Sequence, residues 1–166
     1  MNDVDEFCRD VWPRLASSLG FYCHDAGAGE ELAQEALARA WARWDRISRL
    51  DSPEAWVYRV GLNLCRSRFR RSRAERRALA RLTVSTITSR AAAPSTDEAL
   101  ALRDAVASLP ERQRAAVLLR FFADLPVASV AEALDCAQGT VRSLTSQAIE
   151  RLRTQFDVAV VSEDIQ

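Results

Sequence analysis

Apolar side chains recur at intervals of three and four residues along most of this chain, and this spacing restricts the fold to helices. The first stripe is formed by Val4, Phe7, Cys8, Val11, Trp12, Leu15 and Leu19. Pro13 lies inside that segment and should kink or split it. The glycine-containing stretch HDAGAG at 24–29 is expected to be a loop. Because no alternating, strand-like pattern competes, the sequence predicts an all-α protein.

Further stripes predict the remaining helices and divide the chain into two parts. One helix is expected at about 30–47, and another begins at Ser52–Pro53, since proline at the first helical position loses no needed donor, and runs to about 78 with Trp56, Val60 and Leu64 facing inward. Residues 83–97, TVSTITSRAAAPSTD, lose the periodicity and are typical of a flexible linker. The helices predicted after it span roughly 97–107, 110–123, 126–134 and 137–154.

Helix starts in the second part carry Ser-x-x-Glu spacing, at Ser95–Glu98 and Ser108–Glu111, which is typical of a capping box. The expected organisation is two small helical domains joined by the linker, which leaves their relative placement open. The predicted boundaries are 1–82, 83–97 for the linker, 98–157, and 158–166 for a tail. That tail could dock back, bind a partner or fray, and fraying is the commonest behaviour of termini.

The charge of the chain is zero on average but unevenly distributed. Residues 61–82 contain eight arginines and one glutamate, a net charge of +7, whereas 1–60 and 83–166 are acidic at −4 and −3. All 23 basic residues are arginine. A concentrated positive block indicates a contact with a polyanion, because so many like charges on a solvated helix face would repel one another.

Cysteine, histidine and hydropathy patterns argue against several other classes of protein. The four cysteines lie far apart and His24 is the only histidine, whereas a zinc site needs about four clustered ligands. We therefore expect free thiols, no metal, no other cofactor and, without a catalytic constellation, no enzyme. The acidic start MNDVDEFCRD is no secretory signal, and no apolar run reaches the roughly 18 residues of a membrane span. The expected location is the cytoplasm.

Two short predicted helices near the carboxy terminus have the spacing of a helix-turn-helix. Val127, Val130, Ala131 and Leu134 form one stripe, DCAQG forms the bend, and Val141, Leu144, Ala148 and Leu152 form the next stripe. Such a second helix can present its first residues to base edges in the major groove. The candidate DNA-binding residues are Gln138, Thr140, Arg142, Ser143, Ser146 and Gln147. A plain helical hairpin in a bundle would show the same apolar spacing, so the pattern alone leaves that alternative open.

The stretch 109–153, which begins LPERQR and contains GTVRS, resembles domain four of bacterial sigma factors of the extracytoplasmic-function (ECF) type. The resemblance is closest to actinobacterial members, which often have GTVKSQASRAL. It implies that this domain reads the −35 promoter element and docks on the β flap of RNA polymerase. Thr140, Arg142 and Ser143 would contact DNA, with Arg120 near the DNA backbone.

The amino-terminal part resembles domain two of the same family in two segments. GEELAQEALARAWARW at 29–44 is similar to the segment that binds the β′ coiled coil of core RNA polymerase, with Leu32, Ala36 and Trp41 packed inside. The residues implied to face the polymerase are Glu31, Gln34, Glu35 and Arg39. SPEAWVYRVGLNLCRSRFRRSRAERR at 52–77 is similar to the segments that capture the melted −10 element.

Within 52–77, an R-x-x-x-N match at Arg59 and Asn63 implies that Asn63 recognises a base. The backbone of the single strand would be held by Arg66, Arg68, Arg70, Arg71 and Arg73. Positively charged tracks hold phosphates through counterion release, and single-stranded bases bind by stacking or in pockets. Trp56 is expected in the core, and Tyr58 is either a stacking platform or a residue at the rim.

The resemblance implies an ECF sigma factor that binds core RNA polymerase, recognises −35 and −10 elements and promotes DNA opening, with promoter DNA and an anti-sigma factor as further partners. Two weak DNA contacts on one assembly act together through effective concentration, which explains a thinly charged recognition helix. Ser67, Leu144 and Gln147 depart from the family pattern. They favour one alternative, a degenerate interaction protein that occupies polymerase or an anti-sigma factor. The other alternative is a dimeric helix-turn-helix regulator that acts without polymerase.

Overall fold

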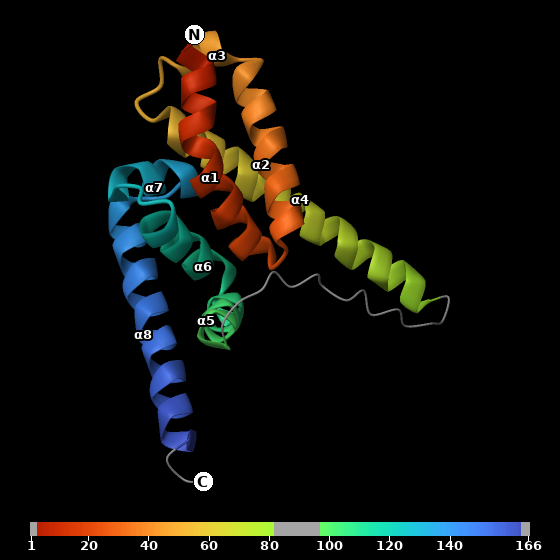
Figure 1. Cartoon of the computed structure of the whole chain (residues 1–166), viewed down its shortest axis with the longest axis vertical. Coiled ribbons are helices and arrows are strands. Elements are labelled where there is room, and N and C mark those ends of the chain that lie inside the picture. Colours follow the sequence, from red (N-terminus) through yellow and green to blue (C-terminus); the bar gives the residue numbers. More distant parts are fainter. Residues whose placement is uncertain (1–2, 82–96, 164–166) are drawn as a thin grey trace.

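The computed structural model describes residues 3–81 and 97–163, and every regular element in these two ranges is helical (Figure 1). The first range contains α1 (Asp3–Cys23), α2 (Ala26–Trp41), α3 (Trp44–Ile47) and α4 (Pro53–Ala80). The second contains α5 (Asp97–Ser108), α6 (Glu111–Val117), the π-helical turn η1 (Leu118–Phe122), α7 (Val127–Leu134) and α8 (Gln138–Glu163). The all-α prediction is confirmed. The predicted linker lies outside the described residues except for Asp97, which begins α5.

Helices α1 and α2 form a tight hairpin because two glycines let their backbones touch. A Cβ atom placed on Gly29 would lie 2.3 Å from the backbone nitrogen of Gly20 and 2.7 Å from the carbonyl oxygen of Ala16. Real Cβ atoms do not approach backbone so closely, and therefore only glycine fits this crossing. Helix α4 crosses behind the hairpin, and its second half extends away from the rest of the protein (Figure 1).

We expect Gly29→Ala to destabilise the protein by about 2 kcal/mol or more, because the added methyl group meets backbone atoms that cannot rotate away. The hairpin would have to open along its length to make room. Urea unfolding followed by circular dichroism measures the loss. Gly139→Ala is the matched control, since a Cβ at Gly139 meets no atom within 4 Å among the described residues. Equal stability of the two variants would contradict the packing described for Gly29.

The predicted loop in this hairpin is wrong, and of the two outcomes predicted at Pro13, a kink or a split, the split does not occur. Helix α1 runs through Pro13 without being split, because Pro13 lies on the solvent-exposed side, where water can solvate a carbonyl that has lost its hydrogen bond. Helix α2 begins at Ala26, inside the stretch expected to be a loop, and ends before a short α3. The carboxylate of Asp25 caps it by accepting a 3.0 Å hydrogen bond from the Ala28 amide.

Helix α4 starts as predicted, with the Ser52 hydroxyl accepting a hydrogen bond from the Ala55 amide at 3.1 Å. Its inward face is rotated relative to the expected stripe. Trp56, Val60 and Leu64 are only partly buried against the core. The buried positions of α4 are Ala55, Val57, Tyr58, Gly61, Leu62 and Cys65. The helix is rotated this way because α1 crosses at Gly61, where a Cβ would lie 2.7 Å from a Leu19 methyl group.

The carboxy-terminal part contains the predicted helix-turn-helix. Helix α7 ends at Leu134, and the left-handed backbone of its cap residue Asp135 (φ 53°) turns the chain toward α8, which begins three residues later at Gln138. Val130 and Ala131 of α7 and Val141 and Ala148 of α8 are buried, as their spacing predicted. Helix α8 continues as helix to Glu163, beyond the predicted end at about 154.

The prediction of a capping box at Ser108–Glu111 is wrong. Ser108 is the last residue of α5 and donates a hydrogen bond to the carbonyl of Ala105, so its hydroxyl faces back along α5. Pro110 occupies the capping position of α6 and offers no side-chain acceptor. Glu111 is therefore free to pair elsewhere. Ser95, the start of the other predicted box, lies outside the described residues.

The two halves of the chain share one hydrophobic core. Leu15 and Leu19 of α1 belong to the same buried cluster as Leu119 of η1 and Val130 of α7. The rings of Phe21 and Phe122 meet across the boundary, with their centroids 4.5 Å apart. This packing places α7 against α4 and η1 against α1, so the arginine-rich helix and the helix-turn-helix lie next to each other.

Candidate nucleic-acid interface

All six residues predicted to read DNA from the recognition helix lie on its exposed surface. They are Gln138, Thr140, Arg142, Ser143, Ser146 and Gln147. These six residues face outward because Val141 and Ala148 are fully buried on the opposite side of α8 and fix the rotation of the helix about its axis. The structure therefore brings these residues together on one face, and their contact with DNA stays a prediction.

One edge of that face is already ordered by side-chain hydrogen bonds. The amide oxygen of Gln147 accepts from the amide nitrogen of Gln113 at 3.0 Å, and the amide nitrogen of Gln147 donates to the Ser143 hydroxyl at 3.1 Å. Gln113 is itself buried. Arg142 lies one residue before Ser143 and is exposed, which leaves the guanidinium accessible to a base edge.

Arg120, predicted near the DNA backbone, has a partner within its own domain. Its guanidinium donates to the backbone carbonyl of Leu125, in the loop between η1 and α7. This hydrogen bond braces the entrance to the helix-turn-helix. The structure thus gives Arg120 a positioning role, and a phosphate contact from its remaining donors stays a prediction.

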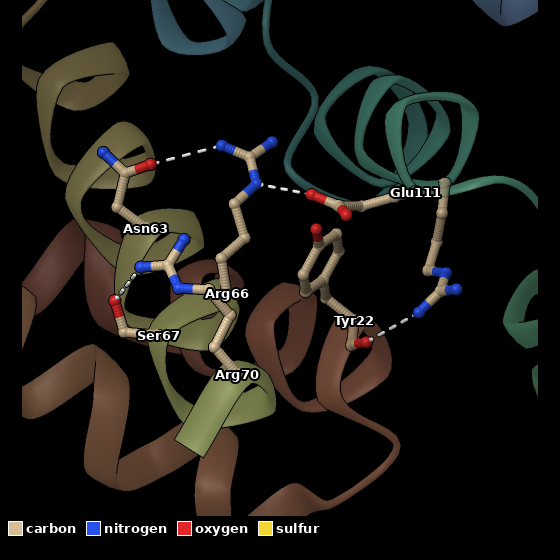
Figure 2. Close-up of polar contacts among 7 residues, drawn as sticks. Tyr22, Asn63, Arg66, Ser67, Arg70 and Glu111 are labelled. Atoms are coloured by element: carbon tan, nitrogen blue, oxygen red, sulfur yellow. Dashed lines mark hydrogen bonds and ion pairs between the residues drawn. The ribbon is translucent and has the colours of Figure 1, made fainter. Parts of the chain in front are cut away.

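The second candidate surface is the polar face of α4, which carries Asn63 and the arginine block (Figure 2). Asn63 is exposed, and its amide oxygen accepts a hydrogen bond from Arg66 at 3.2 Å. One turn further, Arg70 donates to the Ser67 hydroxyl at 3.0 Å. Ser67, one of the departures from the family pattern, therefore orients an arginine. The amide nitrogen of Asn63 is oriented away from Arg66 in Figure 2.

The outer part of the block is solvent-exposed and strongly basic. Arg68 pairs with Glu31 of α2 at 3.2 Å with both side chains largely exposed, whereas Arg71 and Arg73 stand on the projecting half of α4. Exposed ion pairs are weak and are screened by salt. A polyanion can therefore displace Glu31 at little cost and use all three arginines.

Arg66 and Arg59 differ from the rest of the block because they contact the second half of the chain. Arg66 pairs with Glu111 of α6 at 2.6 Å, and Arg59 donates to the carbonyl of Glu132 and lies 3.7 Å from the carboxylate of Asp135 (Figure 2 for Arg66). Partial burial acts to raise the pKa of Glu111. The hydrogen bond and positive charge of Arg66 outweigh that effect and hold the pKa below its usual value. The carboxylate is therefore charged at neutral pH.

The aromatic candidates are placed by the structure. Tyr58 is fully buried and is neither a stacking platform nor a rim residue. Burial, followed by the nearby charge of Glu54, raises its pKa. Trp56 is partly buried against the core, close to the prediction. Tyr22, which the sequence did not single out, lies beside Arg66 and Glu111 at the boundary between the halves (Figure 2).

The outward face of α2 carries the residues predicted to bind polymerase. Glu31, Gln34, Glu35 and Arg39 are all exposed, and Arg39 pairs with Glu35 one turn away at 2.8 Å. The prediction that Trp41 packs inside is wrong, because its side chain is 52% exposed. Trp41 follows Gln34 by two helical turns and so extends the same face. A large apolar group at the end of a charged face is a feature of binding surfaces.

These features define a two-domain, all-α protein of the helix-turn-helix DNA-binding class that has a second exposed surface rich in arginine. Within residues 3–81 and 97–163, side chains that could ligate a metal do not gather in groups of three. All four thiols are free, and those of Cys23 and Cys65 are buried with their sulfur atoms 2.9 Å apart. Nor does any helix in the described ranges have the length and hydropathy needed to cross a membrane.

Comparison with known proteins identifies the family. The family model "Sigma-70 region 2" matches residues 8–75, and "Sigma-70, region 4" matches residues 99–152. The RNA polymerase sigma-E factor of Streptomyces antibioticus is 30% identical over 128 residues, covering 77% of this chain and 70% of that protein. The sigma-E factor of Streptomyces coelicolor is 29% identical over 93% of this chain and 86% of its own length. The chain belongs to the bacterial RNA polymerase sigma factors of the ECF type.

Solved structures share the fold. The sigma factor RpoE of Bartonella quintana, determined in complex with the anti-sigma factor NepR, superimposes with a TM-score of 0.78 at 23% identity over 95% of this chain and 99% of that one. CnrH, determined with the cytosolic domain of CnrY, gives a TM-score of 0.67 at 19% identity over 93% of this chain and 88% of that one. Both similarities extend over both halves of the chain, and hence over the arrangement of the two domains.

Proposed function

We propose that this sigma factor binds core RNA polymerase, reads the −35 element with α8 and captures the melted −10 strand with the polar face of α4, acting in the cytoplasm where the polymerase is. The observation that carries the proposal is the exposure of two separate polar surfaces on one chain, each lying in its own sigma-70 family region. Initiation chemistry belongs to the polymerase, and this subunit selects and opens the promoter.

The two surfaces are suited to different forms of DNA. Helix α8 presents one guanidinium and several short polar groups, which suits base edges in a duplex major groove. The face of α4 combines one amide with a row of arginines, which suits a single strand whose bases have left the stack. The proposed domains are therefore 1–82 for polymerase and the −10 element, and 98–157 for the −35 element.

Polymerase binding is proposed to use α2 and the middle of α8. The exposed α2 face that ends at Trp41 would meet the β′ coiled coil. A groove of about 470 Å³ lies between the end of α5 and the middle of α8, lined by Ser108, Leu109 and Thr154 among others. Since it lies beyond the exposed recognition residues on α8, the β flap can dock there while the first turns of α8 contact DNA. An anti-sigma factor would compete for these surfaces.

We expect Trp41→Ala to weaken binding to core polymerase about tenfold or more, since buried tryptophans are frequent energetic centres of interfaces. Leu79→Ala is the matched control, because Leu79 is also exposed, at 58%, but lies on α4. Titration of fluorescently labelled sigma factor with core enzyme measures both variants. Equal affinities for Trp41→Ala and wild type would remove Trp41 from the polymerase surface.

The proposal is tested by comparing duplex binding with and without polymerase. Purified protein should co-purify with core enzyme, and a −35 duplex should be protected from nuclease only when both are present. Protection by the sigma factor alone, at similar concentration, would instead favour a stand-alone helix-turn-helix regulator.

A further inference from the structure

The contact between the two halves uses arginines that the proposed function assigns to DNA. Arg66 and Arg59 both belong to the −10 surface, and both are bound to groups of the −35 domain. Figure 2 shows Arg66 between Asn63 of its own helix and the carboxylate of Glu111 on α6. A carboxylate bound to a guanidinium occupies the same donors that a phosphate would use. In this structure Glu111 therefore occupies a donor of Arg66 that a phosphate could otherwise use.

Further contacts across the boundary surround this ion pair. Arg114 of α6 donates to the carbonyl of Tyr22 at 3.2 Å, and its guanidinium lies 5.5 Å from the centre of the Tyr22 ring. On the other side, Arg14 of α1 donates to the carbonyl of Ala123 at 3.1 Å. The interface between the two halves thus has an apolar centre surrounded by directed hydrogen bonds.

This arrangement cannot persist on a promoter. Elements centred at −10 and −35 are 25 base pairs apart, which corresponds to about 85 Å of duplex at roughly 3.4 Å per base pair. Here Arg59 of the −10 surface lies against Asp135, five residues before Thr140 of the recognition helix. Five residues span at most about 18 Å of extended chain. Both elements can be bound together only if the two halves separate.

We propose that the −35 domain is an intramolecular occupant of the −10 surface: Glu111 and Asp135 hold Arg66 and Arg59 in the free protein, and the phosphates of the promoter strand replace these carboxylates when the halves part. The proposal rests on the proposed function, because it takes these arginines as the ones that hold the strand. It adds that the free sigma factor offers single-stranded DNA an incomplete −10 surface, in which Arg59 and Arg66 are occupied, while its recognition helix stays exposed.

The ion pairs that hold the two halves together are weak. The carboxylates of Glu111 and Asp135 have side chains that are 57% and 93% exposed, so water and salt compete for their partners. Among the described residues, the buried Nε atom of Arg114 has no hydrogen-bond partner, which lowers the stability of the interface. Polymerase binding to either domain can therefore shift the equilibrium.

The double variant Glu111→Gln with Asp135→Asn tests the proposal, because it removes both carboxylates with little change in shape. The control is Asp104→Asn with Glu150→Gln, which removes the same charge from exposed positions of the same domain. Small-angle X-ray scattering of the free proteins measures separation of the halves. Fluorescence anisotropy with a labelled mixed-sequence single strand of about 12 nucleotides at low salt measures access to the −10 surface.

For the double variant we expect a larger radius of gyration and about two- to tenfold tighter binding to the single strand than for the control. Scattering and affinity that both match the control overturn the proposal, as does expansion without tighter binding. The reversed pair, Arg66→Glu with Glu111→Arg, should restore the closed scattering profile that Arg66→Glu alone loses. If the protein with the reversed pair does not regain the closed scattering profile, that result also contradicts the proposal that these ion pairs hold the two halves together. Transcription with core polymerase tests the proposed function separately. If the double variant transcribes normally but shows neither expansion nor tighter binding to the single strand, the contact proposed between the halves is refuted and the proposed function is not.

Discussion

Replacing Asn63 by alanine is expected to reduce promoter opening by roughly ten- to a hundredfold while leaving polymerase binding nearly unchanged. The amide is exposed on α4 between the core and the arginine row, and its oxygen is oriented by Arg66 at 3.2 Å. An amide positioned in this way can hydrogen-bond a base that has left the stack, and loss of one such contact costs about 1–3 kcal/mol. Opening is measured by 2-aminopurine fluorescence in the −10 element, and polymerase affinity by titration.

The comparison of the two measurements decides the role of Asn63. Leu79→Ala is a suitable control, because Leu79 is exposed on the same helix and is assigned to no contact with the strand. If Asn63→Ala lowers polymerase binding and opening equally, Asn63 is a structural residue and the assignment to a base is wrong.

The second large effect is expected at Arg142. Arg142→Ala should weaken −35 recognition by the holoenzyme about 5- to 150-fold, the equivalent of about 1–3 kcal/mol for one bidentate contact with a base. The effect is confined to one or two positions of the element, because Arg142 is the single cation on the exposed first turns of α8. Competition with duplexes that carry each base substitution identifies the position read.

Arg153→Ala is the matched control for Arg142. It removes the same charge from the same helix, but 11 residues further along, where Arg153 is 67% exposed and pairs with Glu150. At about 1.5 Å per residue, this is more than 15 Å from Arg142. If both variants lose affinity equally and for every sequence, α8 holds the DNA backbone only. If neither loses affinity at any promoter, the chain is a degenerate member of its family.

The sequence predicted the helices and the recognition face because both depend on local periodicity. The stripe on α8 fixes which residues are outward, and Val141 and Ala148 are buried as expected. Short-range capping was predicted less well. Asp25 caps α2 although glycines follow it, and Glu111 pairs with Arg66, 45 residues earlier, where the sequence indicated a capping box. A spacing of three residues suggests a cap but does not exclude a distant partner with a stronger charge.

The packing of the two halves could not be predicted from the sequence. Residues 83–97 carry no periodic signal, so nothing local fixes how the second domain meets the first. The aromatic residues show the same limit. Tyr58 is buried because α1 and α4 cross at Gly61, a tertiary contact that the spacing of apolar residues on either helix does not reveal, and Trp41 at the end of α2 is exposed although its apolar stripe placed it inside. The ion pair between Arg66 and Glu111 depends on this packing and is seen only in the structure.

Run-off transcription from a genomic promoter library, with core polymerase and the purified chain, tests the central claim most directly. A working sigma factor should give specific transcripts that require the chain and that start at a constant distance from a shared pair of −35 and −10 motifs. Stable co-purification with polymerase but no specific transcripts would contradict it, and would mean that the chain occupies the polymerase without reading promoters.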